Sequence, residues 1–302
     1  MKKAIGYGVM PAAMTIWNSD ESFNQRETER YLQWLIEKGA HCLSVTGSTG
    51  ENISMGFEEQ KHIMEVMIKS VAGAVPIYAG TGRYTTAETI ELSEYAQKCG
   101  AAGVLVIMPY YLIPHKRAVM NHFRELRQAI NIDICLYNNP RFCNYEMTPL
   151  EIKQMFNEGS INAIKTAVGD VERVHSLRYH CGDSMRIFYG HDINPMEAFC
   201  AKADGWLSGL PAVLPKFCRT LFDICTVDKN IDKANEYFYK ALPFIDYYLT
   251  YTTNDPHWHE VFKYALQLQG FDAGLPRRPL GDLDLTEKKT VNSLFENMSE
   301  IL

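Results

Sequence analysis

The feature that most constrains the fold of this chain is a repeated unit, in which a short apolar run is followed by a turn and an amphipathic helical pattern. The unit recurs eight times before about residue 225. Strands that are apolar along their whole length, and that alternate with helices, favour a parallel sheet covered on both faces. Eight such units predict a closed (β/α)8 barrel, the TIM-barrel class of α/β fold.

The expected strands and helices follow from the hydrophobic periodicity of each unit. The strands are 4–9, 42–46, 75–79, 104–108, 132–137, 161–165, 186–189 and 205–208. The helices are 24–38, 57–71, 86–99, 116–130, 148–157, 171–180, 192–202 and 212–225. A doubly wound sheet is the alternative fold, but it usually has fewer strands and a glycine-rich first turn, and the sequence Gly8-Val9-Met10-Pro11 does not provide one.

The strand signals end at about residue 226. Segments near 230–250, 256–269 and 285–300 have helical periodicity. We therefore expect a (β/α)8 barrel over residues 1–225 and a C-terminal helical extension over residues 226–302.

Composition restricts the partners and the compartment. The net charge is −6 without long runs of lysine and arginine, so nothing favours binding to nucleic acid or to an anionic membrane surface. No apolar run approaches the length of a membrane span. The eight cysteines form no Cys-x-x-Cys pair, a pattern typical of free thiols in a reducing compartment. We expect a cytoplasmic protein that acts on a small metabolite.

The functional side chains of such a barrel lie where its strands end. In this chain the strand ends carry polar residues and tyrosines around one lysine. These ends are Gly47-Ser48-Thr49-Gly50-Glu51, Gly80-Thr81-Gly82-Arg83, Pro109-Tyr110-Tyr111, Tyr137-Asn138-Asn139-Pro140, Lys165, Gly190-His191-Asp192 and Ser208.

Lys165 ends the apolar strand 161–165 and should point into the mouth of the barrel. It could be a lysine that extends to the rim, or one half of a buried ion pair. Alternatively it is a nucleophile, because burial disfavours an ammonium ion and leaves a free amine to attack a carbonyl group. The protonated imine that results would withdraw electrons from the neighbouring carbon, so that a bond there can be broken or made.

Two further strand ends complement the lysine. Tyr137 ends the adjacent strand, so its hydroxyl could transfer the protons that imine chemistry requires, although an aromatic side chain there could equally be packed for burial. Residues 47–50 gather backbone N–H groups and two hydroxyls before a helix, an arrangement that suits a carboxylate or phosphate. The segment lacks the Gly-Lys-Ser/Thr ending of a nucleotide-binding loop, and it would also suit a plain turn.

In order and spacing, these motifs resemble those of the dihydrodipicolinate synthase / N-acetylneuraminate lyase family over nearly the whole chain. The resemblance is carried by Gly47-Ser48-Thr49-Gly50-Glu51, Pro109-Tyr110-Tyr111, Tyr137-Asn138-x-Pro140, Ile164-Lys165, Gly190-x-Asp192, and in the tail Val261-Phe262-Lys263 with Gly270, Gly274 and Pro279. It implies a (β/α)8 barrel with a C-terminal helical part, usually a homotetramer built from tight dimers.

The resemblance also implies roles for the matching residues. Lys165 would form a Schiff base with a small-molecule 2-oxo acid such as pyruvate, without a separate cofactor, and Tyr137 would act as acid and base at the imine. Ser48 and Thr49 would hold the carboxylate of the 2-oxo acid. Thr49 would also join a proton relay that Tyr111 completes from the neighbouring subunit.

Departures from the family pattern concern the second part of the substrate. In the synthase branch an arginine two positions after the proline binds the second carboxylate, but here Phe142 stands there and Arg141 is one position early. The sialic acid branch has Gly-Tyr-Asp-Glu where this chain has Gly190-His191-Asp192-Ile193. We therefore expect an aldolase or hydro-lyase for another 2-oxo acid, such as a 2-keto-3-deoxy sugar acid. Beside Ser48 and Thr49, the residues expected to bind it are Arg141, Gly190, His191, Asp192 and Ser208.

Three alternatives stay open. A synthase that condenses pyruvate with aspartate semialdehyde would need Arg141 in place of the usual arginine. A non-catalytic 2-oxo acid binding protein would not need an imine-forming lysine. A metal-dependent aldolase would need a ligand cluster, but His257 and His259 lie in the helical tail without a third ligand. We expect these two histidines to be solvated on the surface, away from the strand ends, and we expect no metal.

Overall fold

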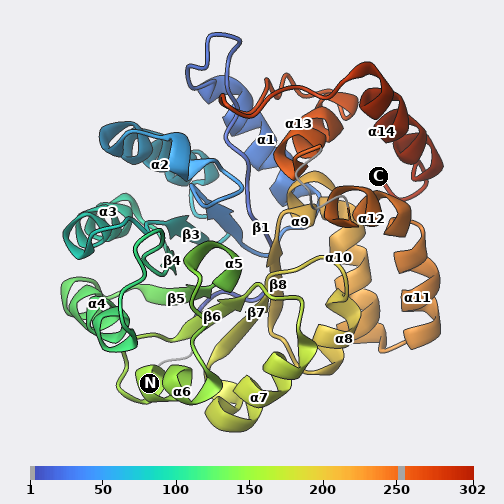
Figure 1. Cartoon of the computed structure of the whole chain (residues 1–302). Helices are drawn as coiled ribbons and strands as arrows, with labels where there is room; N and C mark the ends of the chain where they lie inside the picture. Colours follow the sequence, from blue (N-terminus) through green and yellow to red (C-terminus); the bar gives the residue numbers. More distant parts are fainter. Residues whose placement is uncertain (1–3, 251–255) are drawn as a thin grey trace.

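The computed structural model describes residues 4–250 and 256–302, and its centre is a sheet of eight parallel strands (Figure 1). The strands are β1 (Gly8–Pro11), β2 (Leu43–Val45), β3 (Ile77–Gly80), β4 (Gly103–Ile107), β5 (Asp133–Asn138), β6 (Ala163–Thr166), β7 (Arg186–Tyr189) and β8 (Gly205–Ser208). Their order is β1-β8-β7-β6-β5-β4-β3-β2, and an isolated parallel bridge between Ala12 and Ser44 joins the two ends of this series. The predicted (β/α)8 barrel is confirmed.

Helices alternate with the strands and cover the outside of the barrel (Figure 1). They are α1 (Gln25–Glu37), η1 (Asn52–Ser54), α2 (Phe57–Val71), α3 (Thr86–Cys99), α4 (Lys116–Ala129), α5 (Pro140–Cys143), α6 (Pro149–Asn157), α7 (Val171–Cys181), η2 (Gly182–Ser184), α8 (Pro195–Cys200), α9 (Leu210–Val213) and α10 (Pro215–Asp223). The chain then forms η3 (Ile224–Asp228), α11 (Ile231–Tyr239), α12 (Leu242–Thr250), α13 (Trp258–Leu268) and α14 (Leu285–Asn297).

The first strand differs from its expected position. The sequence predicts it over 4–9, whereas β1 begins at Gly8, which pairs with Gly205 of β8. The backbone N–H of Ile5 donates to the Asp133 carboxylate at 2.6 Å, and that of Gly6 donates to the Tyr78 hydroxyl at 2.9 Å. The segment before β1 therefore bonds to side chains at the N-terminal end of the barrel instead of pairing as a strand.

Proline accounts for two other differences. The helix expected over 192–202 begins at Pro195, and the one expected over 212–225 is divided, because Pro215 starts α10 after α9 has ended. A proline has no N–H to continue a preceding helix, but it is well suited to the first turn of a new one.

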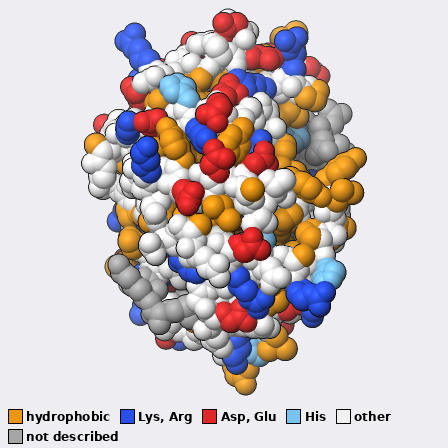
Figure 2. Space-filling model, turned by 90° about the vertical axis from the view of Figure 1, so that its left-hand side faces the viewer, with side chains coloured by type: hydrophobic (Ala, Val, Ile, Leu, Met, Phe, Trp, Pro, Cys, Tyr) orange, Lys and Arg blue, Asp and Glu red, His pale blue; other side chains and the backbone are white. Residues whose placement is uncertain are grey.

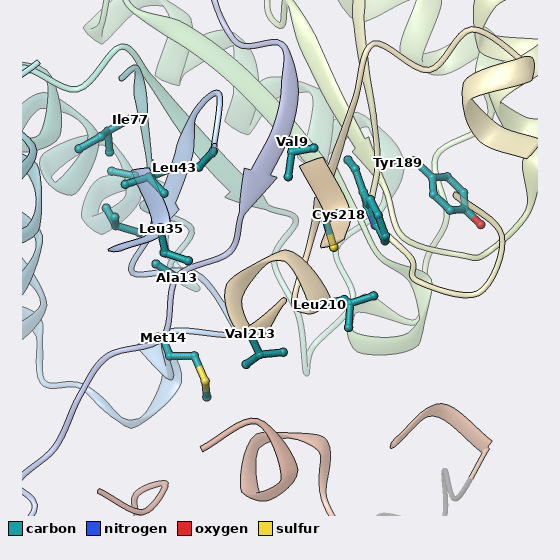
Figure 3. Close-up of a cluster of buried hydrophobic side chains, with 14 of the residues drawn as sticks. Val9, Ala13, Met14, Leu35, Leu43, Ile77, Tyr189, Leu210, Val213 and Cys218 are labelled. Carbon is teal, nitrogen blue, oxygen red and sulfur yellow. The ribbon is translucent and has the colours of Figure 1, made fainter. Parts of the chain in front are cut away.

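Alternate residues of each strand face two separate hydrophobic regions. Between the strands and the helices lies a large buried cluster, part of which is labelled in Figure 3: Val9, Leu43, Ile77 and Tyr189 from strands, with Leu35, Leu210, Val213 and Cys218 from helices. Inside the barrel a second cluster contains Met10, Tyr78, Leu105, Cys135, Phe188 and Leu207. Side chains fill the barrel interior, so a ligand can enter only where the strands end.

The C-terminal helices continue directly from the barrel. The π-helical turn η3 follows α10 without a break and crosses residue 225, α11 packs on α10, and α13 packs on α9. The boundary expected near residue 225 stays a prediction. Figure 1 shows these helices, in orange and red, gathered on one side of the barrel.

The outer surface is mixed in character. The face in Figure 2, which is the side on the left of Figure 1, carries acidic and basic side chains interspersed with hydrophobic ones. Within the described part of the chain, no helix has the length and apolar character needed to cross a membrane.

Candidate active site

Strand pairing places Lys165 and Tyr137 together. Tyr137 of β5 is the register partner of Lys165 of β6, whose partner on β7 is Phe188. Partners in register point to the same side of a sheet, and both Tyr137 and Phe188 belong to the cluster inside the barrel. Lys165 therefore also points inward, as its position at the end of a strand predicts.

The two side chains are in contact and buried. The Lys165 Nζ lies 4.2 Å from the centroid of the Tyr137 ring, and the residues are 6% and 7% exposed. Asn139 fixes the tyrosine, because its Nδ2 donates to the Tyr137 hydroxyl at 2.9 Å while its Oδ1 accepts from the Arg141 N–H at 3.1 Å. With that bond the phenolic oxygen keeps its own proton free for donation.

Residues 47–51 form the loop after β2. Thr49 is buried, at 6% exposure, and Ser48 is half-buried. The Ser48 carbonyl accepts the Glu51 N–H at 3.0 Å, so the loop turns back on itself. This turn presents the side chains of Ser48 and Thr49 to the same cavity as Lys165.

A cavity of about 350 Å³ lies over the ends of the strands. It is lined by Ser48, Thr49, Tyr137, Asn139, Pro140, Arg141, Phe142, Lys165, Ala167, Val168, Gly190, His191, Asp192, Ser208, Gly209, Tyr248, Leu249, Trp258 and Phe262. All of the predicted site residues except Tyr111 therefore line one cavity.

Gly190 allows Lys165 to occupy its position. A Cβ at Gly190 would stand 2.7 Å from the Lys165 Cε and 2.9 Å from the Thr166 carbonyl oxygen. The side chain of Lys165 thus passes directly over the backbone of this glycine.

Both oxygens of the Asp192 carboxylate accept hydrogen bonds from other residues of the protein. Its Oδ1 accepts from the Trp206 Nε1 at 3.0 Å, and its Oδ2 accepts from the Tyr248 hydroxyl at 3.0 Å and the Leu210 N–H at 3.3 Å. Burial raises the pKa of Asp192, and the neighbouring His191, together with hydrogen bonds from Ser208, Tyr248 and Leu210, opposes that rise. This carboxylate holds strand ends and α12 together at the wall of the cavity.

His191 and Arg141 both line this cavity, close enough to interact electrostatically. Burial lowers the pKa of His191, Asp192 raises it, and the positive charge of Arg141 lowers it further. Arg141 and Phe142 both belong to the short helix α5, and both line the cavity, so the one-residue shift of the arginine does not turn it away.

Tyr111 lies apart from the other predicted residues. It is 86% exposed with a φ of 74°, and Leu112 and Ile113 beside it are also exposed. A left-handed backbone is uncommon for a residue that is not glycine, so the loop holds this phenol outward at some cost.

Sequence reasoning missed the contribution of the C-terminal helices. Tyr248, Trp258 and Phe262 line the cavity, although their segments follow the last strand by tens of residues. The expectation that His259 is a solvated residue away from the strand ends was wrong. His259 is 7% exposed, and its Nε2 lies 3.1 Å from the Ser48 carbonyl oxygen.

The described residues contain no group of three or more His, Cys, Asp or Glu side chains placed to hold a metal ion. Every cysteine is a free thiol.

Comparisons with known proteins agree with this geometry. The model of the dihydrodipicolinate synthetase family matches residues 6–298. The chain belongs to this family. The 4-hydroxy-tetrahydrodipicolinate synthase of Clostridium perfringens (strain SM101 / Type A) is 31% identical over 266 residues, 88% of this chain and 89% of the relative. The enzyme of the same name from Pelobacter propionicus is 32% identical, over 87% of this chain and 90% of the relative.

A solved structure gives the same result at the level of the fold. YagE, a prophage protein belonging to the dihydrodipicolinic acid synthase family from E. coli K12, was crystallised in complex with pyruvate. It superposes with a TM-score of 0.91 at 26% identity, and the match covers 99% of this chain and 100% of YagE. As a member of the family, the chain is a Schiff-base-forming, pyruvate-dependent lyase of the class I aldolase type. The alternative of a non-catalytic binding protein is not favoured.

Proposed function

We propose that Lys165 is the amine of this lyase, and that it forms an imine with the C2 carbonyl of pyruvate or a larger 2-oxo acid. The observation that carries the proposal is the pairing of a buried lysine amine with a buried tyrosine in one cavity, 4.2 Å from amine to ring centroid. Attack of the amine on C2 gives a carbinolamine, and loss of its hydroxyl as water leaves the protonated imine.

Neighbouring residues carry out proton transfer and bind the carboxylate of the substrate. The Tyr137 hydroxyl protonates the carbinolamine hydroxyl, which leaves as water, and the resulting phenolate later takes a proton back, while Asn139 holds the tyrosine in place. Ser48 and Thr49 bind the carboxylate of the 2-oxo acid with their hydroxyls and backbone N–H groups. No separate cofactor takes part, because the imine itself is the electron sink.

The cavity leaves room for more than pyruvate. At about 350 Å³ it is larger than a three-carbon acid requires, and Arg141, His191 and Ser208 line it together with the aromatic Phe142 and Trp258. We therefore propose cleavage or dehydration of an extended 2-oxo acid, such as a 2-keto-3-deoxy sugar acid.

Reductive trapping tests the proposal. The protein incubated with pyruvate and borohydride should gain a pyruvate-sized mass on the peptide that contains Ile164-Lys165-Thr166, because reduction turns the imine into a stable secondary amine. Lys165→Ala should abolish the label. A wild-type chain that stays unmodified at saturating pyruvate would refute the assignment of Lys165.

A second candidate is 4-hydroxy-tetrahydrodipicolinate synthase itself, which would condense pyruvate with aspartate semialdehyde. Arg141 favours it, because this residue lines the cavity despite its shifted place in the sequence. The identity of the relatives is also consistent with it. Kinetics with the two classes of substrate, described below, separate the candidates.

We also propose that the working unit is at least a dimer, and a homotetramer built from dimers when complete. Tyr111 would then enter the partner's cavity from its exposed loop, since it does not reach its own. The free thiols are consistent with a cytoplasmic enzyme.

A further inference from the structure

Helix α13 contacts both ends of the loop formed by residues 47–51. His259 and Lys263 are four residues apart on α13, so they lie on the same face of the helix. His259 contacts the start of the loop and Lys263 contacts its end.

At the start of the loop, the His259 ring donates to the Ser48 carbonyl. Burial lowers the pKa of His259 to about 3, so the ring is neutral and carries one proton. A carbonyl oxygen can only accept, so that proton is on Nε2, 3.1 Å from the Ser48 oxygen. The Trp258 ring stacks on the imidazole with centroids 3.6 Å apart and limits its rotation.

At the end of the loop, Lys263 and Glu51 form a buried pair. The Lys263 Nζ lies 3.7 Å from the Glu51 carboxylate and donates to the carbonyls of Thr15 at 2.5 Å and Ala273 at 3.0 Å. The hydroxyl of Thr15 in turn donates to the Gly50 carbonyl at 2.7 Å. Helix α13 thereby fixes the end of the loop in two ways: directly through the Glu51 side chain, and by way of Thr15 through the Gly50 backbone.

The loop needs this support because its backbone is strained at both sides. Thr46 has a φ of 49° and Glu51 a φ of 60°, in the left-handed region that side chains disfavour. Such conformations persist only where surrounding contacts enforce them.

We propose that His259 is a positioning residue, which holds Ser48 and Thr49 where they can bind the carboxylate of the 2-oxo acid. The role rests on the proposed function, because it presumes that this loop is the carboxylate subsite. His259 itself does not line the cavity, so it acts through the Ser48 carbonyl.

The test compares three substitutions of His259 by the pyruvate concentration that gives half-maximal borohydride trapping. His259→Gln places an amide N–H at the position of Nε2 and should stay within about threefold of wild type. His259→Asn has the same polarity but reaches only to the position of Nδ1, and His259→Ala has no donor. Both should need roughly five- to tenfold more pyruvate, the loss of one hydrogen bond of about 1 kcal/mol. Trapping at saturation should remain complete in all three.

The matched control is His41→Ala. His41 is half-buried at the N-terminal end of the barrel, where its Nδ1 accepts the Val9 N–H at 3.0 Å. It should alter stability without changing the half-maximal pyruvate concentration.

The outcomes separate this inference from the proposal on which it rests. If wild type is not trapped, the Schiff-base assignment fails. If wild type is trapped and the Asn and Ala variants match it, or if Gln and Asn behave alike, His259 has no positioning role and the inference is overturned. Unfolding curves for each variant show whether a change is due to loss of the fold.

Discussion

Lys165 and Tyr137 are register partners on adjacent strands, and the lysine amine lies 4.2 Å from the centre of the tyrosine ring. Their relative position is thus set by the hydrogen bonds between β5 and β6. A site built on strands holds its geometry better than one built on loops.

Tyr137→Phe should lower kcat by roughly 10²- to 10⁴-fold, because it removes the proton-transfer hydroxyl but keeps the ring against Lys165. The imine should still form at long times, so borohydride should label the variant slowly but fully. Tyr189→Phe is the control, since Tyr189 ends the next strand but one and bonds to Asn194 outside the cavity. Equal rates for Tyr137→Phe and wild type would exclude the hydroxyl from the mechanism.

Gly190→Ala should abolish or strongly slow imine formation without unfolding the protein. The new methyl group would displace the Lys165 side chain, because the Thr166 carbonyl on its other side belongs to the sheet and cannot move. Trapping with pyruvate and thermal unfolding measure the two effects. Gly56→Ala, at a glycine with no atom within 4 Å of the added Cβ, should change neither. Normal trapping by Gly190→Ala would show that Lys165 has another way to approach the substrate.

Stability should fall as the pH drops below 6.5, in part because of His259. The native pKa of His259 is lowered to about 3, so between pH 6.5 and 3 the unfolded chain binds the proton and the native one does not. The buried neutral imidazole therefore does not lower the free energy of unfolding above pH 6.5, and it lowers this free energy progressively as the pH falls from 6.5 toward 3. Urea unfolding at pH 6.5 and pH 5 should show a loss that is about 1.5 kcal/mol smaller in His259→Gln than in wild type. Equal losses would mean that the imidazole is solvated in the native state.

Mixing two inactive proteins should restore activity if the site is shared between subunits. In hybrids of Lys165→Ala and Tyr111→Phe, some cavities receive Lys165 from one chain and Tyr111 from the other. Activity should return in part under conditions of subunit exchange, which sedimentation or mass spectrometry can monitor. If the subunits exchange but activity does not return, Tyr111 either takes no part in the mechanism or acts in its own subunit's site.

The choice of the second substrate should depend on Arg141 and Phe142, which line the cavity. Phe142 cannot pair with a carboxylate, and a charge-assisted contact contributes about 1.5–3 kcal/mol, so aspartate semialdehyde should have a kcat/KM roughly ten- to hundredfold below that of the best 2-keto-3-deoxy sugar acid. Arg141→Ala is the diagnostic variant. If aspartate semialdehyde is the best substrate and this variant loses it selectively, Arg141 replaces the missing arginine and the chain is a synthase.

The sequence predicted the barrel because each strand and helix carries its own local pattern. Strands β7 and β8 lie where the periodicity places them. Lys165 faces inward because it lies two residues after Ala163, which faces the barrel interior, and alternate residues of a strand share a face. The first strand could not be placed from pattern alone. The apolar residues near Ala4 fit a strand, but the side chains of Tyr78 and Asp133, far along the chain, take their N–H groups.

The contribution of the C-terminal helices was missed for a related reason. His257 and His259 have the polarity of surface residues, and nothing local indicates that their helix turns toward the strand ends. His259 is buried where its helix packs against the loop of residues 47–51. The helical periodicity near residues 256–269 was visible in the sequence, whereas the tertiary neighbours of α13 were not.

The bond between Ser48 and His259 joins residues 211 positions apart, so it can form only late in translation. At 5–20 residues per second, translation from one residue to the other takes roughly 10–40 s. All eight strands, with Lys165 and Tyr137, leave the ribosome before α13 does. A nascent chain could therefore pair its strands around Lys165 before the contact between His259 and the loop of residues 47–51 exists. If this loop binds the 2-oxo acid as proposed, that binding would be the last property the chain acquires.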